Sequence, residues 1–116
     1  MKRPSAANVS SFVPLRSSAF AVLAALARGP QPGIEILDHI HETVPGTTLF
    51  GGGTLYRLLR DMRDEGLIDR QGPEHADRRH VRHGLTPLGH AVLRAEAMRL
   101  ERTLRLLDAR PSGVRR

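Results

Sequence analysis

Glycine and proline divide this chain into short segments, and the order of those segments restricts the fold. Apolar residues at helical spacing predict a first helix over residues 17–28, capped by Ser17 or Ser18 and ended by Gly29-Pro30. The same spacing predicts a second helix over residues 34–43, which Val44-Pro45-Gly46 ends, and a third over residues 53–65. These segments predict a compact trio of helices.

Two strands are predicted after the trio. Leu67-Ile68-Asp69-Arg70 is typical of a short strand, and residues 71–79 are polar enough to form a loop. From His80 to Leu85 the side chains alternate, with Val81, His83 and Leu85 on one face, which predicts a second strand. Two strands joined by a polar loop cannot form an independent sheet, so they must pack on the helices.

A last helix is predicted from Thr86-Pro87, an N-cap followed by proline in the first turn, to about Ala109. A hairpin directly after the third helix of a compact trio is the layout of a winged helix-turn-helix. We therefore predict a mainly α fold with a small two-stranded β wing: a winged helix-turn-helix domain over residues 15–85 and a long C-terminal helix over residues 86–109. A flexible arm is expected over residues 1–14 and a flexible basic tail over residues 110–116.

The composition favours a polyanionic partner. The 116 residues contain 18 Lys and Arg against 12 Asp and Glu, which gives a formal net charge of +6, and nearly all the positive residues are Arg. Nucleic acid is the commonest polyanionic partner, and Arg makes bidentate contacts to phosphate and guanine that Lys cannot match. The alternative from charge alone is a solvated surface without a specific partner.

The third predicted helix has one apolar and one basic side. On a helical wheel, Leu55, Leu58, Leu59 and Met62 form a stripe suited to the core, while Tyr56, Arg57, Arg60 and Arg63 fall on the opposite side. Acidic residues begin only at Asp61, so the start of the helix carries none. The alternative is an amphipathic surface helix with ion pairs between Arg57 and Asp61 and between Arg60 and Asp64.

This asymmetry fits a helix that reads DNA. Recognition helices enter the major groove with their N-terminal residues nearest the bases, and the unpaired backbone N–H groups there favour phosphate. In the predicted loop, two adjacent arginines are suited to a phosphate or to the minor groove. The predicted DNA-binding residues are Gly53, Thr54, Tyr56, Arg57, Arg60, Arg63, Arg78 and Arg79.

Three groups of motifs carry a resemblance to a known family. They are Gly53-Thr54-Leu55-Tyr56-Arg57 with Leu58-Leu59 and Glu65-Gly66-Leu67-Ile68, then Asp77-Arg78-Arg79 with Leu85-Thr86-Pro87 and Gly89, and finally Gly29-Pro30 with Gly33, Glu35 and Ile36. Together, over about residues 15–107, they resemble the PadR-like transcriptional regulators in their short form. The resemblance implies a homodimer that binds operator DNA, usually represses transcription and can be released by a small-molecule effector, often aromatic or drug-like.

The last predicted helix carries an apolar seam. Leu93, Ala97, Leu100, Leu104 and Leu107 recur at alternating four- and three-residue steps, which suits pairing with another helix. A second stripe, Leu88, Val92 and Ala95, can turn toward the helices of the same chain. Two apolar stripes exceed what one small core covers, so we predict a homodimer with this dimerisation seam. One long helix packed only on its own core is the alternative.

Other functions are less favoured by the sequence. The lack of Cys excludes disulfides, thiolate zinc sites and cysteine catalysis. No nucleophile elbow, phosphate loop or His-Glu-x-x-His motif is present, so we predict neither an enzyme nor a cofactor. No segment is suited to a signal peptide or a membrane span, and we expect a cytoplasmic protein with no membrane partner.

Two alternatives to a DNA-binding regulator stay open. One is a dimeric winged-helix interaction module that does not bind operator DNA. The other is a metal-responsive regulator that uses histidine, which would need several of the six His from different elements. We assign no metal ligand, because His39 and His41 point apart on a helix and His80 and His83 lie on opposite faces of a strand.

Overall fold

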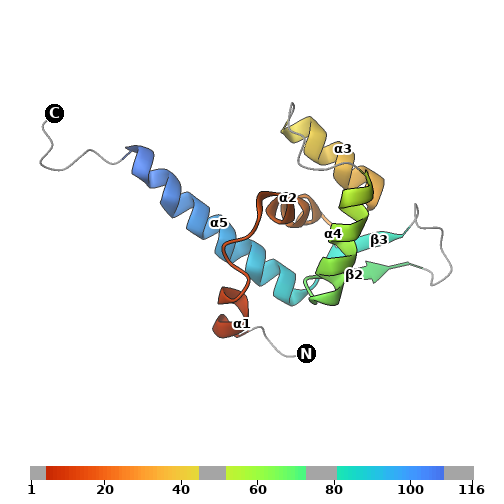
Figure 1. Cartoon of the computed structure of the whole chain (residues 1–116), viewed down its shortest axis with the longest axis horizontal. Helices are drawn as coiled ribbons and strands as arrows, with labels where there is room; N and C mark the ends of the chain where they lie inside the picture. Colours follow the sequence, from red (N-terminus) through yellow and green to blue (C-terminus); the bar gives the residue numbers. More distant parts are fainter. Residues whose placement is uncertain (1–4, 45–51, 73–80, 109–116) are drawn as a thin grey trace, which may run out of the picture.

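The computed structural model describes residues 5–44, 52–72 and 81–108 of the chain. Its helices are α1 (Ala6–Ser10), α2 (Ser17–Leu26), α3 (Gly33–Thr43), α4 (Gly52–Asp64) and α5 (Pro87–Asp108). Its strands are β1 (Gln31–Pro32), β2 (Ile68–Gln71) and β3 (Arg82–Leu85). Figure 1 shows α2, α3 and α4 clustered beside the sheet, with α5 passing beneath them and extending away from the body. The predicted mainly α fold with a β wing is confirmed.

The sheet has three strands where the sequence predicted two. The order is β1-β3-β2 and both pairs are antiparallel, so β3 is central. Strand β1 pairs Gln31 with His83 and Pro32 with Arg82. This two-residue strand lies between Gly29 and α3. The side-chain amide of Gln31 stabilises the turn before the strand by donating to the carbonyl oxygens of Ala25 and Gly29. Proline is tolerated in β1 because this is an edge strand.

One apolar core joins the helices and the sheet. Val22, Leu23 and Ile36 are fully buried, and they meet the apolar stripe of α4 and the start of β2. From α5 only Val92 enters this core completely. The predicted helices and strands therefore pack their apolar faces into one common core.

The end of α4 and the start of α5 are tied together by short hydrogen bonds. The hydroxyl of Thr86 donates to the carbonyl oxygen of Gly66 and accepts from the backbone N–H of Gly89, while the N–H of Thr86 donates to the carbonyl oxygen of Leu67. A β-carbon at residue 89 would overlap that same carbonyl group of Leu67. Thr86 is thus the N-cap of the last helix, as predicted.

The N-terminal segment differs from the expected flexible arm. Residues 6–10 form α1, which packs beside α5, and Val9, Phe12 and Val13 lie partly buried against the core. The backbone N–H of Leu15 donates to Oε2 of Glu96 on α5 at 3.2 Å. Burial of these apolar side chains and that hydrogen bond hold the segment, whereas residues 1–4 and the expected tail at 110–116 lie outside the described residues.

Two helix boundaries also differ from the prediction. The N-cap of α2 is Arg16, which makes no side-chain capping bond, in place of Ser17 or Ser18. The helix ends at Leu26 and not at Arg28, and the chain then turns at Gly29, whose φ of 132° is a conformation that favours glycine. Over residues 5–44, 52–72 and 81–108, no helix is long and apolar enough to cross a membrane.

Candidate nucleic-acid interface

Helix α4 separates an apolar side from a basic side. Leu55, Leu59 and Met62 are between 1% and 2% exposed, which seats the helix on the core. Arg57, Arg60 and Arg63 are exposed. The packing of the leucine stripe therefore fixes the arginines on the outer side of α4, in agreement with the helical wheel.

The arginines of α4 have no acidic partner in the described part of the chain. None of the guanidinium groups of Arg57, Arg60 and Arg63 has a described carboxylate within 4.0 Å, and the pairs with Asp61 and Asp64 are not formed. The positive charge of this face is therefore available to an external anion, which argues against a surface helix neutralised by its own i,i+4 pairs.

Tyr56 lies at the border of the two sides and not on the basic side as the wheel suggested. Its side chain is half-buried, and its ring packs on α3 where Gly33 leaves room. A β-carbon at residue 33 would come within 2.9 Å of Cε1 of the ring. Gly33 therefore provides the space that allows Tyr56 to lie against α3.

The first turn of α4 is open to solvent. Gly53 and Thr54 are both exposed, and a β-carbon at residue 53 would meet nothing within 4 Å. Packing inside the chain therefore does not require glycine at this position. The first turn contains no acidic residue, so its backbone N–H groups favour a negatively charged ligand.

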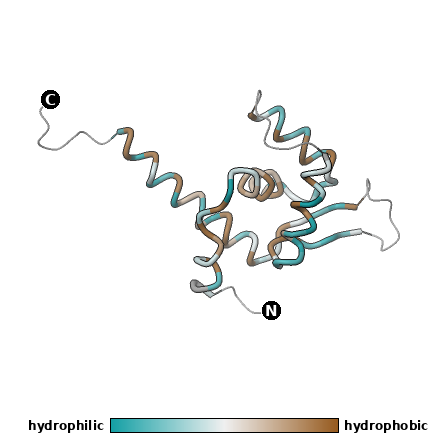
Figure 2. Tube along the Cα trace, in the orientation of Figure 1, coloured by the Kyte–Doolittle hydropathy of each residue, from teal (hydrophilic) through white to brown (hydrophobic). Residues whose placement is uncertain are grey.

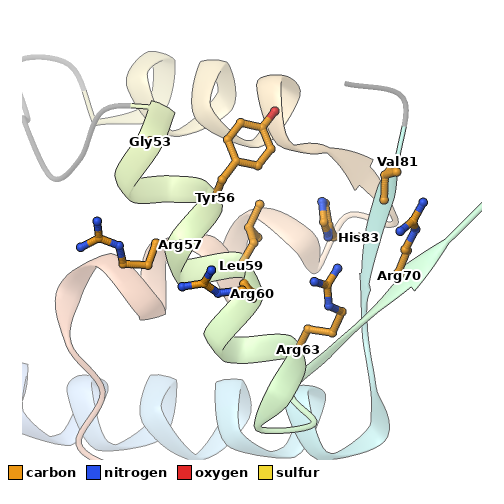
Figure 3. A pocket seen from close by; sticks show the side chains of 9 residues that line it. All are labelled: Gly53, Tyr56, Arg57, Leu59, Arg60, Arg63, Arg70, Val81 and His83. Atoms are coloured by element: carbon orange, nitrogen blue, oxygen red, sulfur yellow. The ribbon is translucent and has the colours of Figure 1, made fainter. Parts of the chain in front are cut away.

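A cleft of about 510 Å³ separates α4 from the sheet. Figure 3 shows the side chains of Arg60, Arg63 and Arg70 around it, with Arg57 at the other side of α4. Strand β2 contributes Arg70, β3 contributes His83, and Val81 lies just before β3. Helix α4 contributes Gly53, Tyr56, Arg57, Leu59, Arg60 and Arg63. Five of the six predicted residues of α4 thus line one basic hollow, which we call the arginine cleft, while Thr54 does not line it.

His83 lies at the sheet side of the arginine cleft. It is 4% exposed, and its Nδ1 has no hydrogen-bond partner among the described residues. Burial lowers the pKa of His83, and the positive charges of Arg63 and Arg70 lower it further. The lowered pKa favours the neutral form of the imidazole beside the arginines.

Two residues of the cleft, Arg70 and His83, are absent from the set predicted from the sequence. They face each other directly across β2 and β3, since Arg70 pairs with His83 in the register. Side chains of such a pair lie on the same face of a sheet. The alternation of the two strands would therefore have predicted that these two residues lie together, had the register of the hairpin been known. The predicted wing residues Arg78 and Arg79 lie outside the described residues.

The far half of α5 exposes apolar side chains. Leu104 is 61% exposed and Leu107 is 83% exposed, and Leu106 and Met98 are also exposed. Figure 2 shows hydrophobic positions alternating with hydrophilic ones along the part of α5 that leaves the body. Leu93, at the other end of the predicted seam, is partly buried against the core of its own chain.

A second hollow is apolar and lies between α2 and α3. It has a volume of about 360 Å³ and is lined by Ser17, Phe20, Ala21, Ala24, Ala25, His39, Ile40, Thr43 and Val44.

No group of three or more acidic or histidine side chains in the described ranges is arranged to hold a metal ion. His75 and His80, which the metal-responsive alternative includes, lie outside those ranges.

This architecture, a helical trio with a small sheet at its side and a long C-terminal helix, defines the class of winged-helix transcription regulators. The chain matches the model of the transcriptional regulator PadR-like family over residues 22–95. It therefore belongs to this family, whose members regulate transcription and are not enzymes.

Solved structures agree on the fold. A PadR family transcription regulator from Clostridium difficile is 20% identical with a TM-score of 0.64, covering 78% of this chain and 93% of its own. A transcriptional regulator from Clostridium thermocellum is 20% identical with a TM-score of 0.64, covering 90% of this chain and 95% of its own. A MarR family protein from Bacillus stearothermophilus is 19% identical with a TM-score of 0.65, covering 92% of this chain and 69% of its own. No curated protein matches the chain in sequence.

Proposed function

We propose that this protein is a sequence-specific DNA-binding regulator that acts as a homodimeric repressor and is released by a small-molecule effector. The observation that carries the DNA-binding part is the exposed basic side of α4, whose arginines have no described acidic partner and stand beside the β2–β3 hairpin. Arginine in this position suits both phosphate oxygens and guanine edges.

The contacts follow from the exposure of each residue. We expect Thr54 and the first N–H groups of α4 to contact a phosphate or a base edge, and Arg57 and Arg60 to contact DNA from the following turn, because these side chains are exposed. Arg63 lines the arginine cleft from the last turn of α4, away from the N-terminal residues of the helix, so it suits the sugar–phosphate backbone. Tyr56 is half-buried, and its contribution is to set the position of α4 against α3 as much as to contact DNA.

Selection of bound sequences from random double-stranded DNA tests this proposal. The full chain should enrich a roughly palindromic sequence, with half-sites about one helical turn apart. The Arg57→Ala/Arg60→Ala variant, folded by circular dichroism, should enrich no sequence. Failure of the unmodified chain to enrich any sequence would favour the interaction module that does not bind operator DNA.

The homodimer rests on the exposed seam of α5. Leu104 and Leu107 lie beyond the body of the chain, where their own core cannot cover them, and a second copy of α5 would bury both by helix pairing. In sedimentation at micromolar concentration we expect a dimer, and a monomer for Leu104→Ser/Leu107→Ser. Arg105→Ser, on the polar side of the same turns, should remain dimeric. A monomer for the unmodified chain would contradict this part of the proposal.

The effector part rests on the apolar groove between α2 and α3. Its walls of Phe20, Ala24 and Ile40 suit an uncharged aromatic compound. A panel of such compounds, screened for release of the selected DNA, should contain active members. Ala24→Phe fills the groove from an exposed position, and it should abolish release while leaving DNA affinity unchanged. Release that is unaffected by Ala24→Phe would contradict this location.

A further inference from the structure

The arginine cleft has the features of a ligand site as well as of a DNA-facing surface. Its volume of about 510 Å³ is in the range of small-molecule sites, while a single phosphate group would fill only part of it. Arg57, Arg60 and Arg63 line it from α4 and Arg70 lines it from β2. No acidic side chain contributes to the lining.

The cleft has a buried polar floor. His83 is 4% exposed, and its Nδ1 finds no hydrogen-bond partner in the described ranges. A buried polar atom without a partner costs about 1–3 kcal/mol, so structures retain such atoms where another group completes them. Figure 3 shows the imidazole of His83 flanked by Arg63 and Arg70.

The charges of the cleft specify the chemistry of its ligand. Several guanidinium groups around one hollow repel each other, and the described residues supply no carboxylate to α4's three arginines within 4.0 Å. An anion with several oxygens relieves this repulsion and accepts the planar, bidentate contacts that guanidinium groups make. A singly charged ion such as chloride cannot bridge two of these groups in that way.

We infer that the arginine cleft binds a small multivalent anion, of the phosphate or diphosphate class, and that the bound anion excludes DNA from α4. This inference rests on the proposed function, since it names the regulation of the same surface. The anion competes directly for Arg60 and Arg63 and requires no change of fold. It differs from an effector in the apolar α2–α3 groove, which lies at different residues and suits an uncharged compound.

Direct binding is tested without DNA, using the full chain and pyrophosphate as the probe. Calorimetry at constant ionic strength, adjusted with sodium chloride, should show saturable binding. Arg63→Ala should weaken it about tenfold, as expected for the loss of one charge-assisted hydrogen bond. Arg94→Ala, an equal loss of charge on exposed α5, should leave it unchanged. The side-chain NMR signals of His83 should shift on titration, and this readout needs no variant.

Competition is tested with the selected DNA at the same constant ionic strength. Pyrophosphate at ten times its dissociation constant should weaken DNA binding about elevenfold for each arginine cleft that it fills, and about 120-fold for a dimer that binds DNA through both clefts. Pyrophosphate that fails to saturate, that binds Arg63→Ala as tightly as the unmodified chain, or that leaves DNA affinity unchanged would overturn the inference. If DNA binding still depends on Arg57 and Arg60, the proposed function survives that result. If the unmodified chain binds pyrophosphate saturably but binds no DNA, the anion site is supported and the proposed function is contradicted.

Discussion

The double variant Arg57→Ala/Arg60→Ala gives the most direct test of how α4 works. Both side chains are exposed, and neither contributes to the apolar stripe that seats the helix. Alanine also favours a helix at least as well as arginine does, so the variant should keep its fold. The expected loss is therefore a loss of contact with DNA and not of structure.

The size of the effect follows from counterion release. If each arginine neutralises one phosphate and both protomers of the proposed dimer bind DNA, the variant loses four phosphate contacts. The logarithm of the DNA affinity should then depend less steeply on the logarithm of salt concentration, by about 0.9 for each contact and 3.6 for all four. Raising salt from about 50 to 200 mM is a fourfold change, and four to the power 3.6 is about 150. The affinity ratio between the unmodified chain and the variant should therefore shrink about 150-fold over this range.

Fluorescence anisotropy with the selected DNA and with a scrambled duplex measures these slopes. Arg16→Ala/Arg94→Ala removes two exposed charges outside α4 and should change the slope little. If the variant loses affinity for the selected DNA by the same factor at every salt concentration, the two arginines contact base edges and not phosphates. Equal slopes and equal affinities for the variant and the unmodified chain would refute the role of α4 in binding DNA.

Three further predictions concern stability. Gly89→Ala should lower the free energy of unfolding in urea by about 3 kcal/mol, because its β-carbon overlaps the backbone carbonyl of Leu67, whereas Gly53→Ala meets nothing within 4 Å and should not destabilise. Glu96→Gln should lower the melting temperature by several degrees and expose residues 5–15 to protease. The reason is that the carboxylate accepts hydrogen bonds from the backbone N–H of Leu15 and, at 2.8 Å, from the guanidinium group of Arg99. An unchanged digestion pattern would count against this prediction. Lowering the pH from about 7.5 to 5.5 should reduce the free energy of unfolding. Burial and the charges of Arg63 and Arg70 lower the pKa of His83, so below about 6.5 the unfolded chain binds the extra proton first. The hydrogen bond from Arg99 lowers the pKa of Glu96, so protonation of Glu96 should lower the free energy of unfolding further at more acidic pH. The variant His83→Gln should abolish only the decrease between about pH 7.5 and 5.5.

Much of this fold could be predicted from local signals. The stripe of Leu55, Leu59 and Met62 predicts the buried side of α4, since its helical period survives in the packed structure. In β3 the alternation holds for Arg82 and His83 but not beyond, because Gly84 is buried as well and Leu85 is half-buried. Thr86 was recognisable as a cap because capping depends only on its neighbours in sequence, and its bond to the N–H of Gly89 is local.

The rest depends on contacts between distant residues. Strand β1 has two residues, one of them proline, and it exists because β3 presents a free edge to it. Tyr56 is half-buried because Gly33, on another helix, has no side chain. Glu96 is 1% exposed although carboxylates are seldom buried, because Leu15 and Arg99 supply its hydrogen bonds. Of these partners only Arg99, an i,i+3 neighbour of Glu96 within α5, could be inferred from a helical wheel.

The joint between α4 and α5 connects the two parts of the proposed function. Where α4 ends, the N–H of Leu67 donates to the carbonyl oxygen of Met62, and Thr86 then binds both Gly66 and Leu67 at the start of α5. These hydrogen bonds couple the end of α4 to the start of α5. If two copies pair along α5, the same joint fixes the spacing of the two recognition helices, and with it the distance between half-sites in the operator. Relaxing the joint by Thr86→Ala should then broaden the spacing recovered by selection while each half-site sequence stays the same.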